Sequence, residues 1–221
     1  MNRDFELERR LTPSGSKTFV VGWHKTATTS LSHALRLLGI PCWHFPYQLC
    51  PFIFDRIPDF RLLASWRAAA DMPVPLIYKD LDREFPHSKF IFTVRDRLEW
   101  LCSVKRMFEI GNKPRMEFGG RSFWDVESET KYTHLIHEKA YGAREFDESR
   151  FLKRFERHAN DVRSYFCHWP DRLLELDVSS RLTWKPLCHF LGRPEPSLPF
   201  PLLNVANSGP WVVNGITIDP L

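Results

Sequence analysis

The stretch TFVVGWHKTATTSLSHALRLLG, residues 18–39, constrains the fold most because its hydrophobic period changes within a few positions. Residues 18–22 form a short apolar run typical of a buried strand, and from Thr28 apolar residues recur at helical spacing until Gly39. The pattern predicts a strand, a turn and a helix. Free backbone N–H groups and the positive end of the helix dipole favour a phosphate or sulfate at such a turn, where Lys25 adds a positive charge.

The rest of the chain continues to alternate between strand and helix patterns. The clearest strand is KFIFTV, residues 89–94. Further strands are expected in 40–45, at the end of AAADMP (68–73) and in 172–178, and helices in 52–66 (interrupted by Pro58), 76–85, 97–110, 148–169 and 184–192. This order predicts a three-layer α/β/α fold of the P-loop nucleotide-binding type, with a central parallel sheet covered on both faces.

The chain is long enough for one substantial core and shows no linker that would divide it. Its 221 residues are 43% hydrophobic, and no Pro/Gly/Ser-rich tract or charge block separates two halves. We therefore expect a single domain over residues 1–221. Within it we expect an N-terminal extension (1–17), a glycine-punctuated aromatic insertion or lid (111–130) and a C-terminal tail (205–221).

Composition excludes several classes of protein. The net charge of +4 is spread over Lys and Arg that alternate with acids, unlike the basic stripe of a nucleic-acid binder. No run of about 20 apolar residues predicts a membrane span, and the charged start MNRDFELERRL is unlike a signal peptide, so we expect a cytoplasmic protein. The five cysteines are an odd number without C-x-x-C spacing, which favours neither a disulfide framework nor a zinc site.

The turn differs from the common phosphate loop G-x-x-x-x-G-K-[ST]. Gly22 precedes Lys25 by only three positions, and no glycine adjoins the lysine. The loop from Gly22 to Lys25 is therefore short and suits one phosphate better than a triphosphate. In a parallel sheet, ligands bind beyond the carboxyl ends of the strands. Two further polar segments leave strands at that edge, DMPVP (71–75) and VRDRLEWLCS (94–103).

KTATTSL after a strand, together with FTVRDRLEWLCSV (92–104), resembles the sulfotransferases that use 3′-phosphoadenosine 5′-phosphosulfate (PAPS). The resemblance continues through residues 71–96 and 172–204 and is greatest to the compact sulfotransferase-domain proteins of bacteria and fungi. It implies in-line transfer of a sulfonate from PAPS to a hydroxyl acceptor, with adenosine 3′,5′-bisphosphate (PAP) as product and no metal required.

The resemblance also implies a donor site. Lys25, with the backbone and hydroxyls that follow it, would hold the 5′-phosphosulfate and stabilise the departing phosphate. Arg95 and Ser103 would grip the 3′-phosphate, although Arg95 could instead pair with Asp96 or Glu99. The late segment NSGPWVVNG lacks the Lys or Arg of the family's basic nucleotide loop. The implied cofactor-binding residues are His24, Lys25, Thr26, Ala27, Thr28, Thr29, Ser30, Arg95 and Ser103.

A hydroxyl acceptor must lose a proton as it attacks sulfur, so a base is expected near Lys25. Asp71 is the first candidate because it occupies the place where the cytosolic relatives carry a catalytic histidine before Leu-Pro. His44 is the second and His24 the third. The simpler interpretation of Asp71 is that it caps the following turn or helix.

Two other functions stay open at this stage. One is a P-loop nucleotide kinase or NTPase, for which Asp177 at a strand end could serve as a magnesium partner. The other is a catalytically silent nucleotide-binding homologue. The acceptor could be a small molecule, a glycan, a lipid or a peptide, with specificity expected from residues 40–54 and 111–126.

Overall fold

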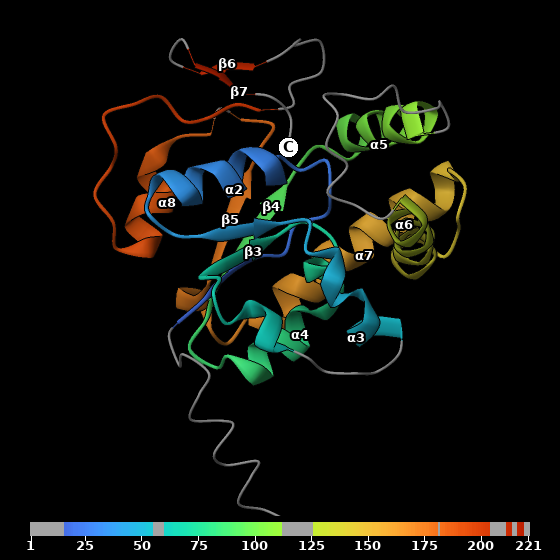
Figure 1. The fold of residues 1–221 in the computed structure, drawn as a ribbon, viewed down its shortest axis with the longest axis horizontal. Coiled ribbons are helices and arrows are strands. Elements are labelled where there is room, and N and C mark those ends of the chain that lie inside the picture. The colour runs from blue at the N-terminus through green and yellow to red at the C-terminus, as the bar shows by residue number, and fades with distance from the viewer. Residues whose placement is uncertain are drawn as a thin grey trace, which may run out of the picture.

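The computed structural model describes residues 16–54, 60–111, 126–180, 182–203, 211–213 and 216–218 (Figure 1). Its centre is a five-stranded sheet in the order β2-β3-β1-β4-β5, in which every neighbouring pair is parallel. The strands are β1 (Thr18–Val20), β2 (Cys42–His44), β3 (Ala68–Ala70), β4 (Lys89–Val94) and β5 (Leu173–Asp177). The central strand β1 pairs Phe19 with Ala69 of β3 and with Phe90 of β4.

Helices cover both faces of the sheet. Alternate residues of the strands enter two cores: Val20 and Ile91 pack with α2 and α8, whereas Phe19 and Phe90 pack with α4 and α7 (Figure 1). This confirms the expected three-layer α/β/α fold. The helices are α2 (Thr28–Leu37), α3 (Cys50–Phe54), α4 (Val74–Glu84), α5 (Arg97–Gly111), α6 (Val126–Tyr141), α7 (Glu148–Phe166) and α8 (Trp184–Leu191), with 3-10 turns at Tyr47–Leu49, Phe60–Leu63 and Pro170–Arg172.

A third apolar cluster lies beside the sheet and joins α5, α6 and α7. Its buried rings include Trp23, Trp100, Tyr141, Phe151 and Phe155. Trp100 of α5 stacks on Phe155 of α7 at 4.2 Å between centroids, and Tyr141 of α6 stacks on Phe151 of α7 at 3.9 Å. Trp23 belongs to the turn after β1, so this cluster lies directly behind that turn.

Three segments differ from or extend the sequence expectations. The sequence pattern did not predict α6. Of the expected insertion, residues 112–125 lie outside the described part of the chain, and residues 126–130 begin α6. The expected tail contains an antiparallel pair, β6 (Trp211–Val213) and β7 (Ile216–Ile218), while residues 1–15 of the expected extension are not described.

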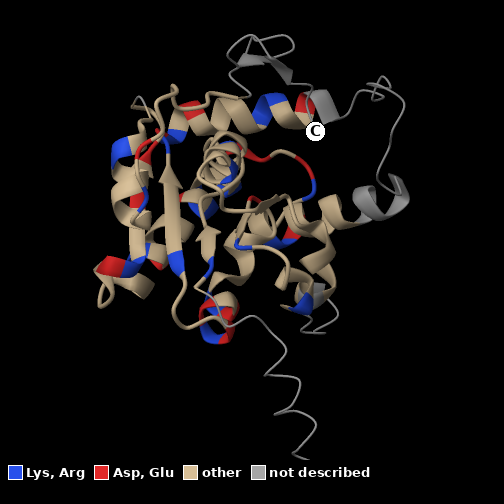
Figure 2. Cartoon of the chain, turned by 60° about the vertical axis from the view of Figure 1, so that its left-hand side comes forward, with Lys and Arg blue, Asp and Glu red and all other residues tan. Residues whose placement is uncertain are grey.

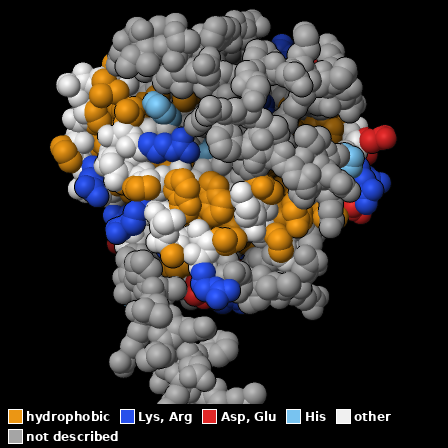
Figure 3. Space-filling model, in the orientation of Figure 1, with side chains coloured by type: hydrophobic (Ala, Val, Ile, Leu, Met, Phe, Trp, Pro, Cys, Tyr) orange, Lys and Arg blue, Asp and Glu red, His pale blue; other side chains and the backbone are white. Residues whose placement is uncertain are grey.

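Charged side chains are distributed over many elements (Figure 2). On the face drawn in Figure 3, Lys and Arg are separated by hydrophobic and uncharged side chains and form no continuous stripe among the described residues. No helix within the described ranges is both long and apolar enough to cross a membrane.

Candidate active site

The turn after β1 has an unusual backbone. Lys25 and Ala27 are non-glycine residues with φ of 64° and 59°, in the left-handed region. Each costs about 1 kcal/mol or more relative to a right-handed conformation, so the surrounding structure must hold them in place. Left-handed residues in such a turn direct backbone N–H groups toward one side and create a concavity that binds anions.

Side chains hold the carbonyl groups of this turn. Because the carbonyl of one residue and the N–H of the next point in opposite directions across a trans peptide, a carbonyl that is held by a donor fixes the direction of the following N–H. Three consecutive carbonyls are held in this way. Thr26 Oγ1 donates a hydrogen bond to the carbonyl oxygen of Trp23 (2.5 Å). Trp100 Nε1 donates to the carbonyl oxygen of His24 (3.0 Å), and Arg95 Nη1 donates to that of Lys25 (3.3 Å).

The N-terminus of α2 completes the concavity. Its N-cap residue, Ala27, provides no side-chain hydrogen bond, and the first turn contains no acidic residue. An anion is therefore the natural partner of these N–H groups. The hydroxyls bond within the protein: Thr28 Oγ1 donates to Asp71 Oδ2 (2.7 Å), and Ser30 Oγ bonds both the carbonyl and the N–H of Leu203 (3.2 and 2.8 Å). The Thr26 hydroxyl bonds the Trp23 carbonyl, and Thr29 Oγ1 lies 3.3 Å from His44 Nε2, so these two hydroxyls also have partners within the protein.

Gly22 is required by close packing at the start of the turn. A Cβ at this position would lie 1.9 Å from Thr93 Oγ1 and 2.5 Å from the Thr93 carbonyl oxygen of β4. We expect Gly22→Ala to lower the free energy of unfolding by about 3 kcal/mol, the upper range for overpacking, as measured by chemical denaturation. The control is Gly39→Ala, whose Cβ meets nothing within 4 Å and carries only the strain of φ 72°. Equal losses in the two variants would contradict the prediction.

Lys25 carries its charge in a partly desolvated position. Burial lowers its pKa, the Asp71 carboxylate opposes this effect, and the positive charge of Arg95 adds to it. Among the described side chains, none forms an ion pair with Lys25 within 4 Å. The neighbouring positive charges of Lys25 and Arg95 disfavour each other, and a nearby negative charge would stabilise both.

Asp71 and His44 form a hydrogen-bonded pair next to this turn. Asp71 Oδ2 lies 3.1 Å from His44 Nε2 and accepts from Thr28, while Oδ1 accepts from the Met72 N–H at 2.7 Å. Burial raises the pKa of Asp71, but the hydrogen bond and charge of His44, the charge of His24 and the Thr28 bond outweigh it and hold this pKa well below its usual range. The His44 side chain is 27% exposed and that of Asp71 13%, so His44 is the more accessible of the two.

His24, the third base candidate, has a buried ring behind the turn. Its Nε2 is hydrogen-bonded to the Tyr141 hydroxyl, and burial lowers its pKa to about 4, with Asp71 opposing and Lys25 adding to that effect. Any contact of His24 with a bound anion would therefore come from its backbone. Sequence reasoning missed both Tyr141 and Trp100, which hold this residue from α6 and α5.

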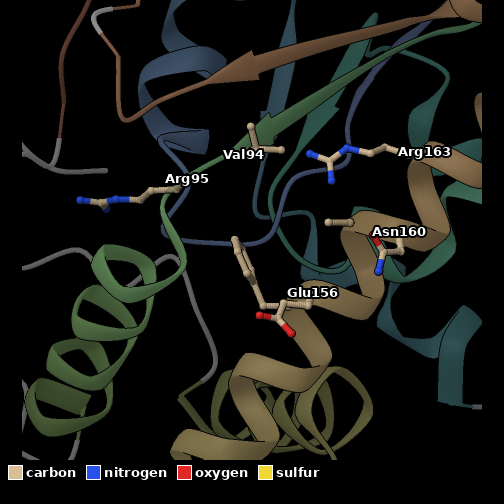
Figure 4. Close-up of a pocket in the computed structure, with 7 residues that line it drawn as sticks. Val94, Arg95, Glu156, Asn160 and Arg163 are labelled. Atoms are coloured by element: carbon tan, nitrogen blue, oxygen red, sulfur yellow. The ribbon is translucent and has the colours of Figure 1, made fainter.

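Arg95 lies between β4 and α5, and Ser103 lies in the second turn of α5. Arg95 Nε bonds Glu99 Oε2 at 3.3 Å, so the ion pair considered from the sequence is present. Ser103 is half-buried. Arg95 also borders a cavity of about 310 Å³ against α7, but its side chain points away from Glu156 and Arg163, which line the same cavity (Figure 4). The guanidinium is therefore available on the side of Lys25, whose carbonyl it contacts.

Asp177, the possible magnesium partner of a kinase, accepts a hydrogen bond from the N–H of Ser179 at 2.8 Å. Within the described ranges, no group of three His, Cys, Asp or Glu side chains is arranged to hold a metal ion. Asp177 thus serves the turn that follows β5.

Fold and site together define a three-layer α/β protein in which a turn with two left-handed residues, Lys25 and Ala27, connects the central strand to the first helix. The chain belongs to the sulfotransferase domain family, whose model matches residues 17–208. It is also similar to Ava biosynthesis cluster protein M of Aspergillus versicolor, with 28% identity over 211 residues that cover 84% of this chain and 79% of the relative. Membership confirms the resemblance seen in the sequence, implies a transferase of the sulfotransferase type, and does not favour the kinase alternative.

Proposed function

We propose that the protein transfers a sulfonate from PAPS to a hydroxyl acceptor by in-line displacement. The observation that carries the proposal is the turn at Lys25, where three carbonyls are held by side chains, next to the Asp71–His44 pair. An anion site and a proton acceptor in contact through Thr28 are the two parts that this reaction needs.

The proposed donor side of the site follows from the direction of the backbone N–H groups and from the positive charges of Lys25 and Arg95. PAPS supplies an activated sulfonate on a phosphate leaving group. The N–H groups of the turn and of α2 bind the 5′-phosphate, and Lys25 offsets the negative charge that develops on the bridging oxygen. Arg95 and Ser103 bind the 3′-phosphate, for which Arg95 must give up or share its bond to Glu99.

On the acceptor side, we propose that His44 accepts the proton of the acceptor hydroxyl and that Asp71 supports His44 in this role. With Nε2–H donated to Asp71, the other ring nitrogen of His44 carries a lone pair that can accept the hydroxyl proton. The carboxylate fixes this tautomer and stabilises the imidazolium that forms. A carboxylate whose pKa is held well below its usual range is itself a weak base, which supports this division of roles.

The relative from Aspergillus versicolor is named as a protein of a biosynthesis cluster. By analogy we propose a small-molecule alcohol or phenol as the acceptor of this chain. A panel of such acceptors, with sugars, lipids and hydroxylated peptides as the other classes, tests this with radiolabelled PAPS. PAP binding without turnover of any acceptor would identify a silent nucleotide-binding homologue instead.

The donor assignment predicts that PAP binds much more tightly than adenosine 5′-monophosphate, as measured by calorimetry. Only PAP offers a 3′-phosphate to Arg95 and Ser103. Arg95→Ala should remove most of this preference, about 2 kcal/mol for a charge-assisted contact.

The matched control is Arg97→Ala, which removes an exposed arginine two positions away that pairs with Glu156 at 2.9 Å. It should leave the preference intact. Equal affinity of the wild type for both nucleotides would reject the donor site, and a thermal shift with ATP and magnesium but not with PAP would support a kinase.

A further inference from the structure

A buried tyrosine and histidine pair lies behind the turn that carries Lys25. The Tyr141 hydroxyl, at the C-terminal end of α6, is hydrogen-bonded to His24 Nε2. The two side chains come from positions 117 residues apart in an otherwise largely apolar cluster. Burying a polar group in such a cluster costs free energy unless the group has a hydrogen-bond partner, and these two groups are partners of each other.

Neither group is accessible to substrate. Tyr141 is 1% exposed and His24 8%. Burial lowers the pKa of His24 to about 4 and, with the charge of Asp71, raises the pKa of Tyr141, so both groups are neutral around neutral pH. The bond is therefore a link within the protein, and any influence of the Tyr141 hydroxyl on the reaction must pass through His24.

We propose that Tyr141 is a positioning residue of the donor site, which acts through His24 to hold Lys25 and the N–H groups of the turn. This inference rests on the function proposed above. Lys25 has φ of 64°, and a non-glycine residue stays in that region only when its surroundings hold it there. The preceding residue is held at two points, its ring by Tyr141 and its carbonyl by Trp100 Nε1 at 3.0 Å.

The hydroxyl, rather than the ring, is the specific part of this arrangement. The Tyr141 ring stacks on Phe151 at 3.9 Å with an interplanar angle of 12°, and on Trp23 at 5.5 Å. A phenylalanine can keep both contacts. Tyr141→Phe consequently removes the link to His24 while it preserves the packing between α6, α7 and the turn.

The experiment measures PAP affinity by calorimetry and thermal stability in parallel. Tyr141→Phe should weaken PAP binding about fivefold, the effect of one typical buried hydrogen bond, because the turn no longer stays in its binding conformation. The control is Tyr165→Phe, which removes the bond from Tyr165 to Asp82 Oδ2 (2.9 Å) away from the site. It should lower the melting temperature and leave PAP affinity unchanged.

A double-mutant cycle separates positioning from general stability. If Tyr141 acts through His24, then Tyr141→Phe should have no further effect on PAP affinity in a His24→Leu background. Additive losses, or an unchanged PAP affinity in Tyr141→Phe with a lower melting temperature, would overturn the inference while the donor site stands. A wild type that does not bind PAP would overturn both.

If Tyr141→Phe does not fold, a measurement on the wild-type protein can still test the inference. Imidazole nitrogen NMR should show His24 as one neutral tautomer around neutral pH, with a shift when PAP binds. A protonated ring, a mixture of tautomers, or no response to PAP would reject the link between Tyr141 and the donor site.

Discussion

Lys25→Ala is expected to lower the rate of sulfonate transfer by about 1,000-fold, the upper range for loss of one group that stabilises charge in a transition state. The charge that Lys25 offsets develops mainly as the bond between sulfur and the bridging oxygen breaks. PAP binding should therefore weaken far less, about tenfold or below, because the N–H groups of the turn and Arg95 still hold the phosphates.

The measurement compares transfer of radiolabelled sulfonate with PAP affinity in the same preparation. Lys79→Ala is the matched control, since Lys79 is an exposed lysine of α4 that lies over the rings of Tyr78 and Tyr165. It should change neither quantity. Equal losses of rate and PAP affinity in Lys25→Ala would make Lys25 a binding residue only. A chelator should leave the wild-type rate unchanged, and a strict magnesium requirement would favour the kinase.

The sequence predicted the fold well where local pattern and tertiary role agree. Residues 18–22 and 89–94 are mainly apolar because both faces of a central parallel strand are buried; the first run contains β1 (Thr18–Val20), and the second forms β4. The sequence interpretation missed α6. Its buried residues Ile136, Ala140 and Tyr141 stand among charged and polar neighbours, although the spacing of four between Tyr132, Ile136 and Ala140 was a usable signal.

The site could be predicted only in part. Lys25, Asp71 and His44 were chosen for their chemistry, and parallel strands bring the latter two together because β2 and β3 end at the same edge. The hydrogen bonds that hold the turn were beyond local reasoning. Trp100 lies 76 positions from His24, and Leu203 is 173 positions from the Ser30 hydroxyl that bonds it. Only the tertiary packing of distant segments determines such pairs.

The last prediction concerns the proton acceptor. Asp71→Asn and His44→Gln should each lower the transfer rate by about 100-fold or more, as expected for loss of general-base catalysis, with little change in PAP affinity. The asparagine is nearly isosteric and can still accept from the Met72 N–H. Its amide can also donate to His44 Nε2, which would move the ring proton to the nitrogen that must receive the acceptor proton.

The double variant distinguishes the two possible bases. If Asp71 acts through His44, combining both substitutions should cost no more than His44→Gln alone, because the two groups work as a unit. If His44→Gln keeps most of the rate and Asp71→Asn does not, Asp71 is the base itself. Near wild-type turnover in both variants would reduce Asp71 to holding Met72 and Thr28 in the turn.

Stability gives an independent check on Asp71, because its folded-state pKa is lower than its value of about 3.9 in an unfolded chain. The ionised carboxylate then stabilises the protein fully above that unfolded pKa, and this contribution is lost as the pH falls toward the folded one. Wild type should therefore be more stable than Asp71→Asn at neutral pH, and the difference should shrink below about pH 4. A pH-independent difference would show that Asp71 is not held as a charged group, and a carboxylate that is not charged could not keep His44 in the tautomer that the reaction needs.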